Sequence, residues 1–110
     1  MNLNIDILEE TGKSIVSLSG EIDAYTAPQL KEALIPLTVE KERTVEVDLE
    51  DVNYMDSTGL GIFISALKST KEHESHLKLI NIQDRVFRLF KITGLDEIID
   101  VNAVIRGGKE

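Results

Sequence analysis

The chain changes from strand to helix within residues 54–61, which read Tyr-Met-Asp-Ser-Thr-Gly-Leu-Gly. Before this stretch, Val45, Val47 and Leu49 alternate with acidic residues, and this period of two predicts a half-buried strand. After it, apolar residues recur at helical spacing, which predicts one buried helix stripe. That stripe consists of Leu60, Phe63, Ile64 and Leu67. A strand followed directly by a helix is the repeating unit of an α/β fold.

The same alternation extends outward over the rest of the chain. Strands are expected at residues 3–7, 15–19, 45–49 and 77–80, and helices are expected to begin near residues 26, 56 and 84. The first two strands form a predicted hairpin, and the later strands are joined by helices, which makes them parallel. We therefore predict one α/β domain over residues 1–110, with a mixed, largely parallel sheet of about four to five strands and helices mainly on one face.

Turn and cap residues refine these boundaries. Residues 20–23 are expected to form a polar loop, followed by a helix that Thr26 and Gln29 begin with a capping box. Pro36 should end or bend that helix, and Gly94 is placed for a left-handed cap after the third helix. Residues 98–101 are predicted as a short strand or a helical turn, and residues 107–108, Gly-Gly, as a frayed tail.

Composition narrows the classes of function. The chain of 110 residues has 12 Lys and Arg against 20 Asp and Glu, a net charge of −8. That sign disfavours nucleic acid and anionic membrane surfaces, and it favours a basic protein partner. The absence of Cys excludes disulfides and thiolate metal sites. The most apolar stretch, residues 59–67, is too short to span a bilayer and no signal peptide is recognised, so a cytoplasmic location is predicted.

Catalytic and metal-binding patterns are weak. His73 and His76 lack a third ligand, and Ser57 does not follow the nucleophile-elbow pattern because Met55 replaces its first Gly. We therefore predict no catalytic residue, no metal site and no cofactor. An alternative remains open, in which carboxylates near strand ends bind Mg²⁺ or a nucleotide and accept a phosphoryl group. Its residues are Asp23, Asp48 and Asp56.

Ser57 itself has two interpretations. It is either the N-cap of the second helix or a modification site. Two small residues, Gly59 and Gly61, are expected to leave the start of this helix bare and open to close approach by another protein. Ile62 is expected to face outward, beside Ser65, Ala66 and Ser69, which makes it a docking candidate.

Three blocks of sequence resemble a known family. Residues 20–23 (Gly-Glu-Ile-Asp), 54–61 and 93–95 (Thr-Gly-Leu) resemble the signature blocks of the STAS domain. More narrowly, they are similar to those of the bacterial anti-sigma factor antagonists, of the RsbV type that serves the general stress response. The resemblance covers essentially the whole chain.

The resemblance implies a regulatory protein without enzymatic activity. In its unphosphorylated form, such a protein binds an anti-sigma factor that is also a serine kinase, and thereby releases the sigma factor. The kinase inactivates it by phosphorylating the serine that matches Ser57, and a PP2C-type phosphatase reactivates it. The resemblance carries over Asp23, and less strongly Glu21, as contacts near this serine. Together with the docking face inferred above from helical spacing and small residues, the predicted partner-binding residues are Glu21, Asp23, Asp56, Ser57, Thr58, Gly59, Gly61 and Ile62. A phosphate on Ser57 is expected to be tolerated by the free amides at the helix N-terminus and to obstruct docking by charge and bulk.

Overall fold

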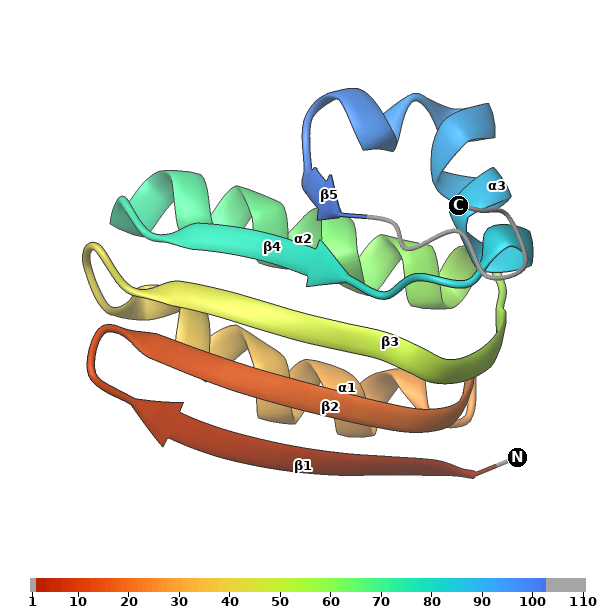
Figure 1. Cartoon of the computed structure of the whole chain (residues 1–110), viewed down its shortest axis with the longest axis horizontal. Coiled ribbons are helices and arrows are strands. Elements are labelled where there is room, and N and C mark those ends of the chain that lie inside the picture. The colour runs from red at the N-terminus through yellow and green to blue at the C-terminus, as the bar shows by residue number, and fades with distance from the viewer. Residues whose placement is uncertain (1, 103–110) are drawn as a thin grey trace.

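Five strands lie side by side in chain order in the computed structural model, which describes residues 2–102 (Figure 1). The strands are β1 (Leu3–Glu10), β2 (Lys13–Ile22), β3 (Thr44–Met55), β4 (His76–Ile80) and β5 (Asp100–Asn102). β1 is antiparallel to β2, and every other neighbouring pair is parallel. The predicted mixed, largely parallel sheet is confirmed.

Three α-helices connect the parallel strands. They are α1 (Ala27–Leu34), α2 (Ser57–His73) and α3 (Asp84–Thr93), and short 3₁₀ turns follow two of them, η1 (Ile35–Val39) and η2 (Leu95–Glu97). Figure 1 shows α1 and α2 side by side behind the sheet. Phe63 of α2 meets Phe90 of α3 edge to face, with ring centroids 6.1 Å apart, so these two helices share one core. None of the helices in residues 2–102 has the length and apolar character needed to span a membrane.

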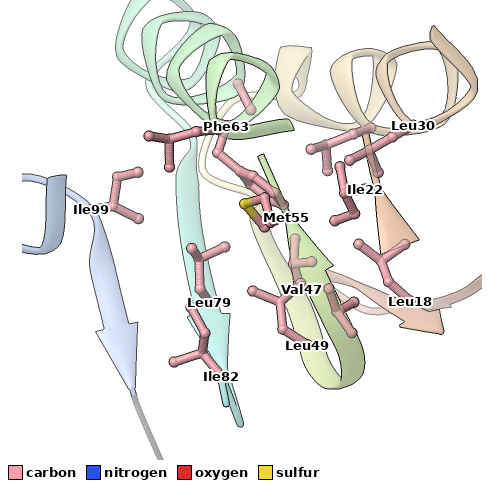
Figure 2. Close-up of a cluster of buried hydrophobic side chains, with 14 of the residues drawn as sticks. Leu18, Ile22, Leu30, Val47, Leu49, Met55, Phe63, Leu79, Ile82 and Ile99 are labelled. Atoms are coloured by element: carbon pink, nitrogen blue, oxygen red, sulfur yellow. The ribbon is translucent and has the colours of Figure 1, made fainter. Parts of the chain in front are cut away.

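The core lies between the helices and one face of the sheet. On that face, the alternate strand residues Val45, Val47 and Leu79 are buried, as the period-two pattern predicts. Figure 2 shows this core, with Phe63 of α2 and Leu30 of α1 on the helix side of the strands. The opposite face of the sheet carries polar pairs such as Lys13 and Glu46, whose Nζ and Oε1 atoms are 3.0 Å apart. This ion pair raises the pKa of Lys13, chiefly through the hydrogen bond to Glu46.

β2 and β3 are longer than the sequence pattern predicts. Residues 20–22, expected in a polar loop, instead continue β2 and pair with residues 52–55 of β3. The register shifts at two points along this pair, which absorbs the break in alternation that concealed the strand. The extension requires a glycine at position 20. The φ of Gly20 is 124°, which L side chains rarely adopt, and a Cβ atom there would clash with the backbone of Asn2. The prediction of a loop from residue 20 was therefore wrong.

The helix ends follow the sequence signals in part. Pro36 lies in η1, directly after α1, and Gly94 has a φ of 78° after α3, so both predicted stops are confirmed. The predicted capping box is wrong, because the side chain of Thr26 does not cap α1. The Gln29 Nε2 atom instead donates to the Leu3 carbonyl oxygen at 3.0 Å. The predicted tail at residues 107–108 lies outside the described residues.

A polar cluster joins the β1–β2 hairpin to the start of β3. The Arg43 Nε atom donates to Ser14 Oγ at 2.8 Å, and Ser14 Oγ donates to Glu9 Oε1 at 2.7 Å. Arg43 Nη2 also donates to Glu9 Oε1, at 2.5 Å. The Ser14 hydroxyl and then the Arg43 guanidinium lower the pKa of Glu9 below its ordinary value. This cluster lies at the opposite end of β2 and β3 from residues 54–61.

Candidate functional site

Two of the three sequence blocks meet at the carboxyl ends of β2 and β3. Ile22 and Met55 are the last paired residues of the two strands. One residue further, the Asp56 amide donates to the Ile22 carbonyl oxygen at 3.2 Å. The loop that begins at Asp23 and the first turn of α2 therefore leave the sheet next to each other, at the carboxyl ends of the strands, where α/β folds place their sites.

Asp56, and not Ser57, caps α2. Its Oδ1 atom accepts from the amides of Thr58 at 3.0 Å and Gly59 at 3.2 Å. Ser57 is consequently the first residue of the helix, and its exposed side chain forms no hydrogen bond within the described part of the chain. The interpretation of Ser57 as the cap was wrong, and its hydroxyl is left to the solvent.

This cap changes what a phosphate on Ser57 would meet. We expected free amides at the helix N-terminus to receive such an anion. Two of those amides, on Thr58 and Gly59, are already occupied by the Asp56 carboxylate. A phosphate on Ser57 would have to compete with that carboxylate for these amides, so it would stay in solvent beside a like charge.

Asp23 organises the loop between β2 and α1. Its side chain is only 6% exposed. Its Oδ1 atom accepts from the amides of Tyr25 at 2.9 Å and Thr26 at 3.1 Å. In return, Thr26 Oγ1 accepts from the Asp23 amide at 2.9 Å and donates to the Glu21 carbonyl oxygen at 2.9 Å. The Asp23 carboxylate, expected to contact a partner, is thus directed into its own loop.

The remaining predicted polar site residues lie around these loops. Thr58 is exposed in the first turn of α2. Glu21 is half-buried, and its Oε1 atom accepts from the Asn2 amide at 3.4 Å. Glu21 is also the register partner of Tyr54, which is 46% exposed. The structure therefore brings together Glu21, Asp23, Asp56, Ser57 and Thr58 at the carboxyl ends of β2 and β3.

The two glycines of α2 have different surroundings. Gly59 is buried, and a Cβ atom there would lie 2.5 Å from Ile22 Cγ2 and 3.0 Å from the Ile22 carbonyl oxygen. Gly61 is partly exposed, and a Cβ atom there would meet nothing within 4 Å. The expectation that Gly59 is open to a partner was wrong, because this position brings α2 close to the end of β2. Gly61 alone leaves bare backbone at the surface.

Ile62 and Ile64 exchange their expected environments. Ile62, expected to face outward, is partly buried against the core, whereas Ile64, expected in the buried stripe, is 39% exposed. The buried side of α2 includes the small residues Gly59 and Ala66, so the helix is rotated from the stripe that its large residues predict. Ile64 lies seven residues after Ser57, about two helical turns along the same exposed side.

The rest of the expected docking face is only partly covered, because Ser65 and Ser69 are half-buried. Ala66 is fully buried, and Ser69 Oγ is hydrogen-bonded to Thr38 Oγ1 of η1 at 2.6 Å. Conversely, Tyr25 was missed by the sequence analysis, although its side chain is 85% exposed. The signal that could have found it is an aromatic residue between two short polar residues that favour turns, Asp23 and Thr26.

The three carboxylates of the alternative hypothesis are not brought together. Asp48 pairs with Ser17 and Ile80 in the sheet, and its Oδ1 atom accepts from Asn81 Nδ2 at 3.2 Å. It precedes Asp56 by most of β3, roughly 26 Å of extended strand. Within residues 2–102, no group of three His, Cys, Asp or Glu side chains is placed to hold a metal ion.

Both the sequence and the fold of this chain are similar to those of known proteins. The family model of the STAS domain matches residues 4–106. The chain is 46% identical over 108 residues to a Bacillus subtilis protein named anti-sigma-B factor antagonist, and the match covers 98% of each chain. Its fold is similar to that of an anti-sigma factor antagonist from Mycobacterium paratuberculosis, with a TM-score of 0.82, 25% identity and coverage of 94% and 87% of the two chains.

A further likeness is structural only. The Bacillus cell fate determinant SpoIIAA, solved in its phosphorylated form, superposes with a TM-score of 0.71 over 91% of this chain and 92% of that chain. The two sequences are 17% identical. The fold described above is therefore one that also occurs in a protein known to carry a phosphate.

Proposed function

Because the chain belongs to the STAS-domain family and, within it, to the anti-sigma factor antagonists of the anti-sigma-B type, we propose that phosphorylation of Ser57 controls its binding to an anti-sigma factor. Members of this group are regulatory binding proteins and not enzymes. The unphosphorylated protein binds an anti-sigma factor that is also a serine kinase, and this releases a sigma factor. A PP2C-type phosphatase reverses the modification, and the cycle takes place in the cytoplasm.

The observation that carries this proposal is the state of the Ser57 side chain. It is exposed on the first residue of α2, and its hydroxyl is not used by the described part of the fold. A kinase needs such a hydroxyl, because it must bring the oxygen in line with the γ-phosphate of ATP while supplying the metal and the base itself. Asp56 performs the capping that a serine at this point of a helix often performs.

Modification would weaken binding through charge and hydration. A phosphate brings about −1.5 to −2 charge at neutral pH. Asp56 is the adjacent residue, and residues 20–26 and 53–62 contain neither Lys nor Arg to offset the added charge. A partner that covers Ser57 must remove water from this anion. If the partner places an acidic side chain opposite Ser57, one like-charge pair across the interface at about 6 Å costs on the order of 3 kcal/mol at an effective dielectric near 20, more than a hundredfold in affinity.

The surface proposed to dock has its centre at the tip of α2. It combines the exposed residues Ser57 and Thr58 with the partly exposed Asp56 and Gly61, and Ile64 extends it along the helix. Glu21 and Asp23 border it from the end of β2. Gly59 and Ile62, which helical spacing and small size placed on the expected docking face, would contribute by shaping the helix beneath this surface.

The alternative function is a phosphoacceptor centred on Asp23 or Asp56 that uses Mg²⁺ or a nucleotide. Both carboxylates accept two backbone amide protons each through Oδ1, and within residues 2–102 no group of three His, Cys, Asp or Glu side chains is placed to hold a metal ion. The observations on Ser57 favour phosphorylation of the hydroxyl.

One experiment separates these functions. The protein is incubated with ATP and the anti-sigma factor kinase of the same organism, and its intact mass and peptide map are then measured. We expect one phosphate, stable to hydroxylamine, on the peptide that contains Ser57, and we expect a PP2C-type phosphatase to remove it. The variant Ser57→Ala should stay unmodified. A hydroxylamine-labile phosphate on Asp23 or Asp56 would support the alternative, and the absence of any phosphate would contradict both.

A further inference from the structure

We propose that Tyr25 is the aromatic anchor of the surface that binds the anti-sigma factor, and that Asp23 serves binding by holding Tyr25 in place. The inference rests on the function proposed above and deepens it. It gives the buried carboxylate of Asp23 an indirect role, as a positioning residue, in place of the direct contact that the family resemblance implies.

The exposure of Tyr25 motivates the proposal. Its side chain is 85% exposed, more than any other large hydrophobic side chain in residues 2–102. A tyrosine offers a large apolar ring with a polar end and has few rotatable bonds to immobilise. Residues that dominate binding energies at protein interfaces are enriched in tyrosine for this reason.

The loop holds Tyr25 in a defined position. Asp23 Oδ1 accepts from the amide of Tyr25 at 2.9 Å, and the Asp23 carbonyl oxygen accepts from Ala27, the first residue of α1, at 2.8 Å. Thr26, 3% exposed, closes the loop from the other side through its hydroxyl. Asp23 and Thr26 both direct their side chains inward, so Tyr25 is the large side chain that the loop presents to solvent. An anchor fixed before binding loses less conformational entropy when the complex forms.

The position of the loop links Tyr25 to the phosphorylation site. The bond from the Asp56 amide to the Ile22 carbonyl oxygen joins the residues that precede Asp23 and Ser57. Figure 1 shows β2 and β3 ending at the same side of the sheet, and both loops leave from there. A partner that covers the tip of α2 therefore meets the Tyr25 loop next.

Charge specifies the chemistry of the partner surface. The ends of β2 and β3 carry the acidic side chains Glu21 and Asp56, and residues 20–26 and 53–62 contain no basic side chain. The complementary surface is a hollow lined by apolar side chains that accepts the tyrosine ring, with Lys or Arg opposite Glu21 and no basic side chain opposite Ser57. This surface belongs to the anti-sigma factor.

The first test measures affinity for the unphosphorylated protein by calorimetry, with the anti-sigma factor of the same organism. We expect Tyr25→Ala to bind at least tenfold more weakly and Tyr25→Phe to bind within threefold of the original protein. Leu8→Ala is the matched control, because Leu8 is 57% exposed and pairs with Ile15 near the other end of β2. It should leave the affinity unchanged.

The second test asks whether Asp23 acts through Tyr25. Asp23→Ala should weaken binding on its own but have little further effect when Tyr25 is already alanine, because two residues that act through one contact are not additive. Asp23→Asn keeps one side-chain oxygen acceptor and should restore most of the affinity. Hydrogen exchange of the Tyr25 and Thr26 amides should accelerate in Asp23→Ala and not in Tyr25→Ala.

The outcomes separate this inference from the proposed function. If the original protein binds but Tyr25→Ala binds equally well, the anchor is refuted while the function stands. If Asp23→Ala and Tyr25→Ala weaken binding additively, the positioning role of Asp23 is refuted. If the original protein does not bind the anti-sigma factor at all, both the function and the inference fail.

Discussion

Gly59 of α2 lies so close to Ile22 at the end of β2 that a Cβ atom would stand 2.5 Å from Ile22 Cγ2. This contact sets how closely Ser57, the proposed phosphorylation site, approaches the loop that carries Tyr25. The Ile22 carbonyl oxygen also accepts a hydrogen bond from the amide of Asp56. Ile22 therefore positions the start of α2 through two contacts, this hydrogen bond and its packing against Gly59.

Replacing Gly59 should therefore damage the fold. We expect Gly59→Ala to lower the free energy of unfolding by about 1–3 kcal/mol, because the added methyl group must displace the Ile22 side chain and crowds the Ile22 carbonyl oxygen. Gly61→Ala is the matched control. A Cβ atom there meets nothing within 4 Å, so it should raise stability by about 0.5–1 kcal/mol through its helix propensity. Urea unfolding of both variants checks this, and equal effects would contradict the difference in their surroundings.

The charge on Ser57 should control affinity. Ser57→Ala is expected to bind the anti-sigma factor as the unphosphorylated protein does, whereas Ser57→Asp is expected to bind at least about tenfold more weakly, a loss of roughly 1.4 kcal/mol. The reason is the added anion beside Asp56. Calorimetry at matched salt measures both, and equal affinities would refute the charge argument.

Ile64 should contribute to binding and Ile62 to stability. Ile64→Lys places a charge on a side chain that is 39% exposed, so we expect weaker binding to the anti-sigma factor with a melting temperature close to the original. Ile62→Lys removes an apolar side chain packed against the core, so it should lower the melting temperature clearly. The reverse pattern in thermal melts and calorimetry would show that Ile62 is the docking residue.

The contribution of the Asp56 cap to stability can be measured without changing Ser57, the proposed phosphorylation site. Asp56→Ala removes the acceptor for the Thr58 and Gly59 amides, and we expect it to cost about 0.5–2 kcal/mol of stability. Asp56→Asn keeps an oxygen acceptor and should cost less. Chemical denaturation measures these differences, and a stable alanine variant would mean that Ser57 can replace the cap.

Glu9 should make folding sensitive to acid. The Ser14 hydroxyl and the Arg43 guanidinium lower its pKa below the ordinary value of 4.5. A carboxylate with a lowered pKa stabilises the fold above its ordinary pKa, and this contribution is lost as the pH falls through the folded value. Relative to the original protein, Glu9→Gln should therefore be less stable near neutral pH, and the difference should shrink below pH 4.5.

Urea midpoints measured across that pH range test the sign of the Glu9 effect. Glu10→Gln removes a neighbouring carboxylate outside the Ser14–Arg43 cluster, and it is the matched control. A difference between Glu9→Gln and the original protein that grows as the pH falls would show that the sign is wrong.

Local sequence patterns predicted most of the fold because buried and more exposed residues alternate along the first halves of β2 and β3. Val45 and Val47 are buried as the period of two requires, and Gly94 stops α3 as expected. The extension of β2 through Ile22 could not be predicted, since the register shifts interrupt the alternation there. Such a shift depends on pairing with β3, which no local pattern contains.

The sequence identified most residues of the candidate site but not how their side chains are arranged. Motif resemblance singled out Ser57 and Asp56, yet which of them caps α2 depends on backbone conformation. The rotation of α2 that buries Ile62 and exposes Ile64 depends on where small residues let the helix approach the sheet. Tyr25 was missed because exposure of a single loop side chain is a property of the folded surface.

If the Asp56 carboxylate keeps the Thr58 and Gly59 amides when Ser57 carries the proposed phosphate, the two forms of the protein would share one architecture. Information about past stress would then be stored covalently, on a single oxygen atom, and not in a rearranged chain. The proposed kinase and phosphatase would then add and remove the phosphate at their own turnover rates, and the ratio of these rates would set how long the modification persists.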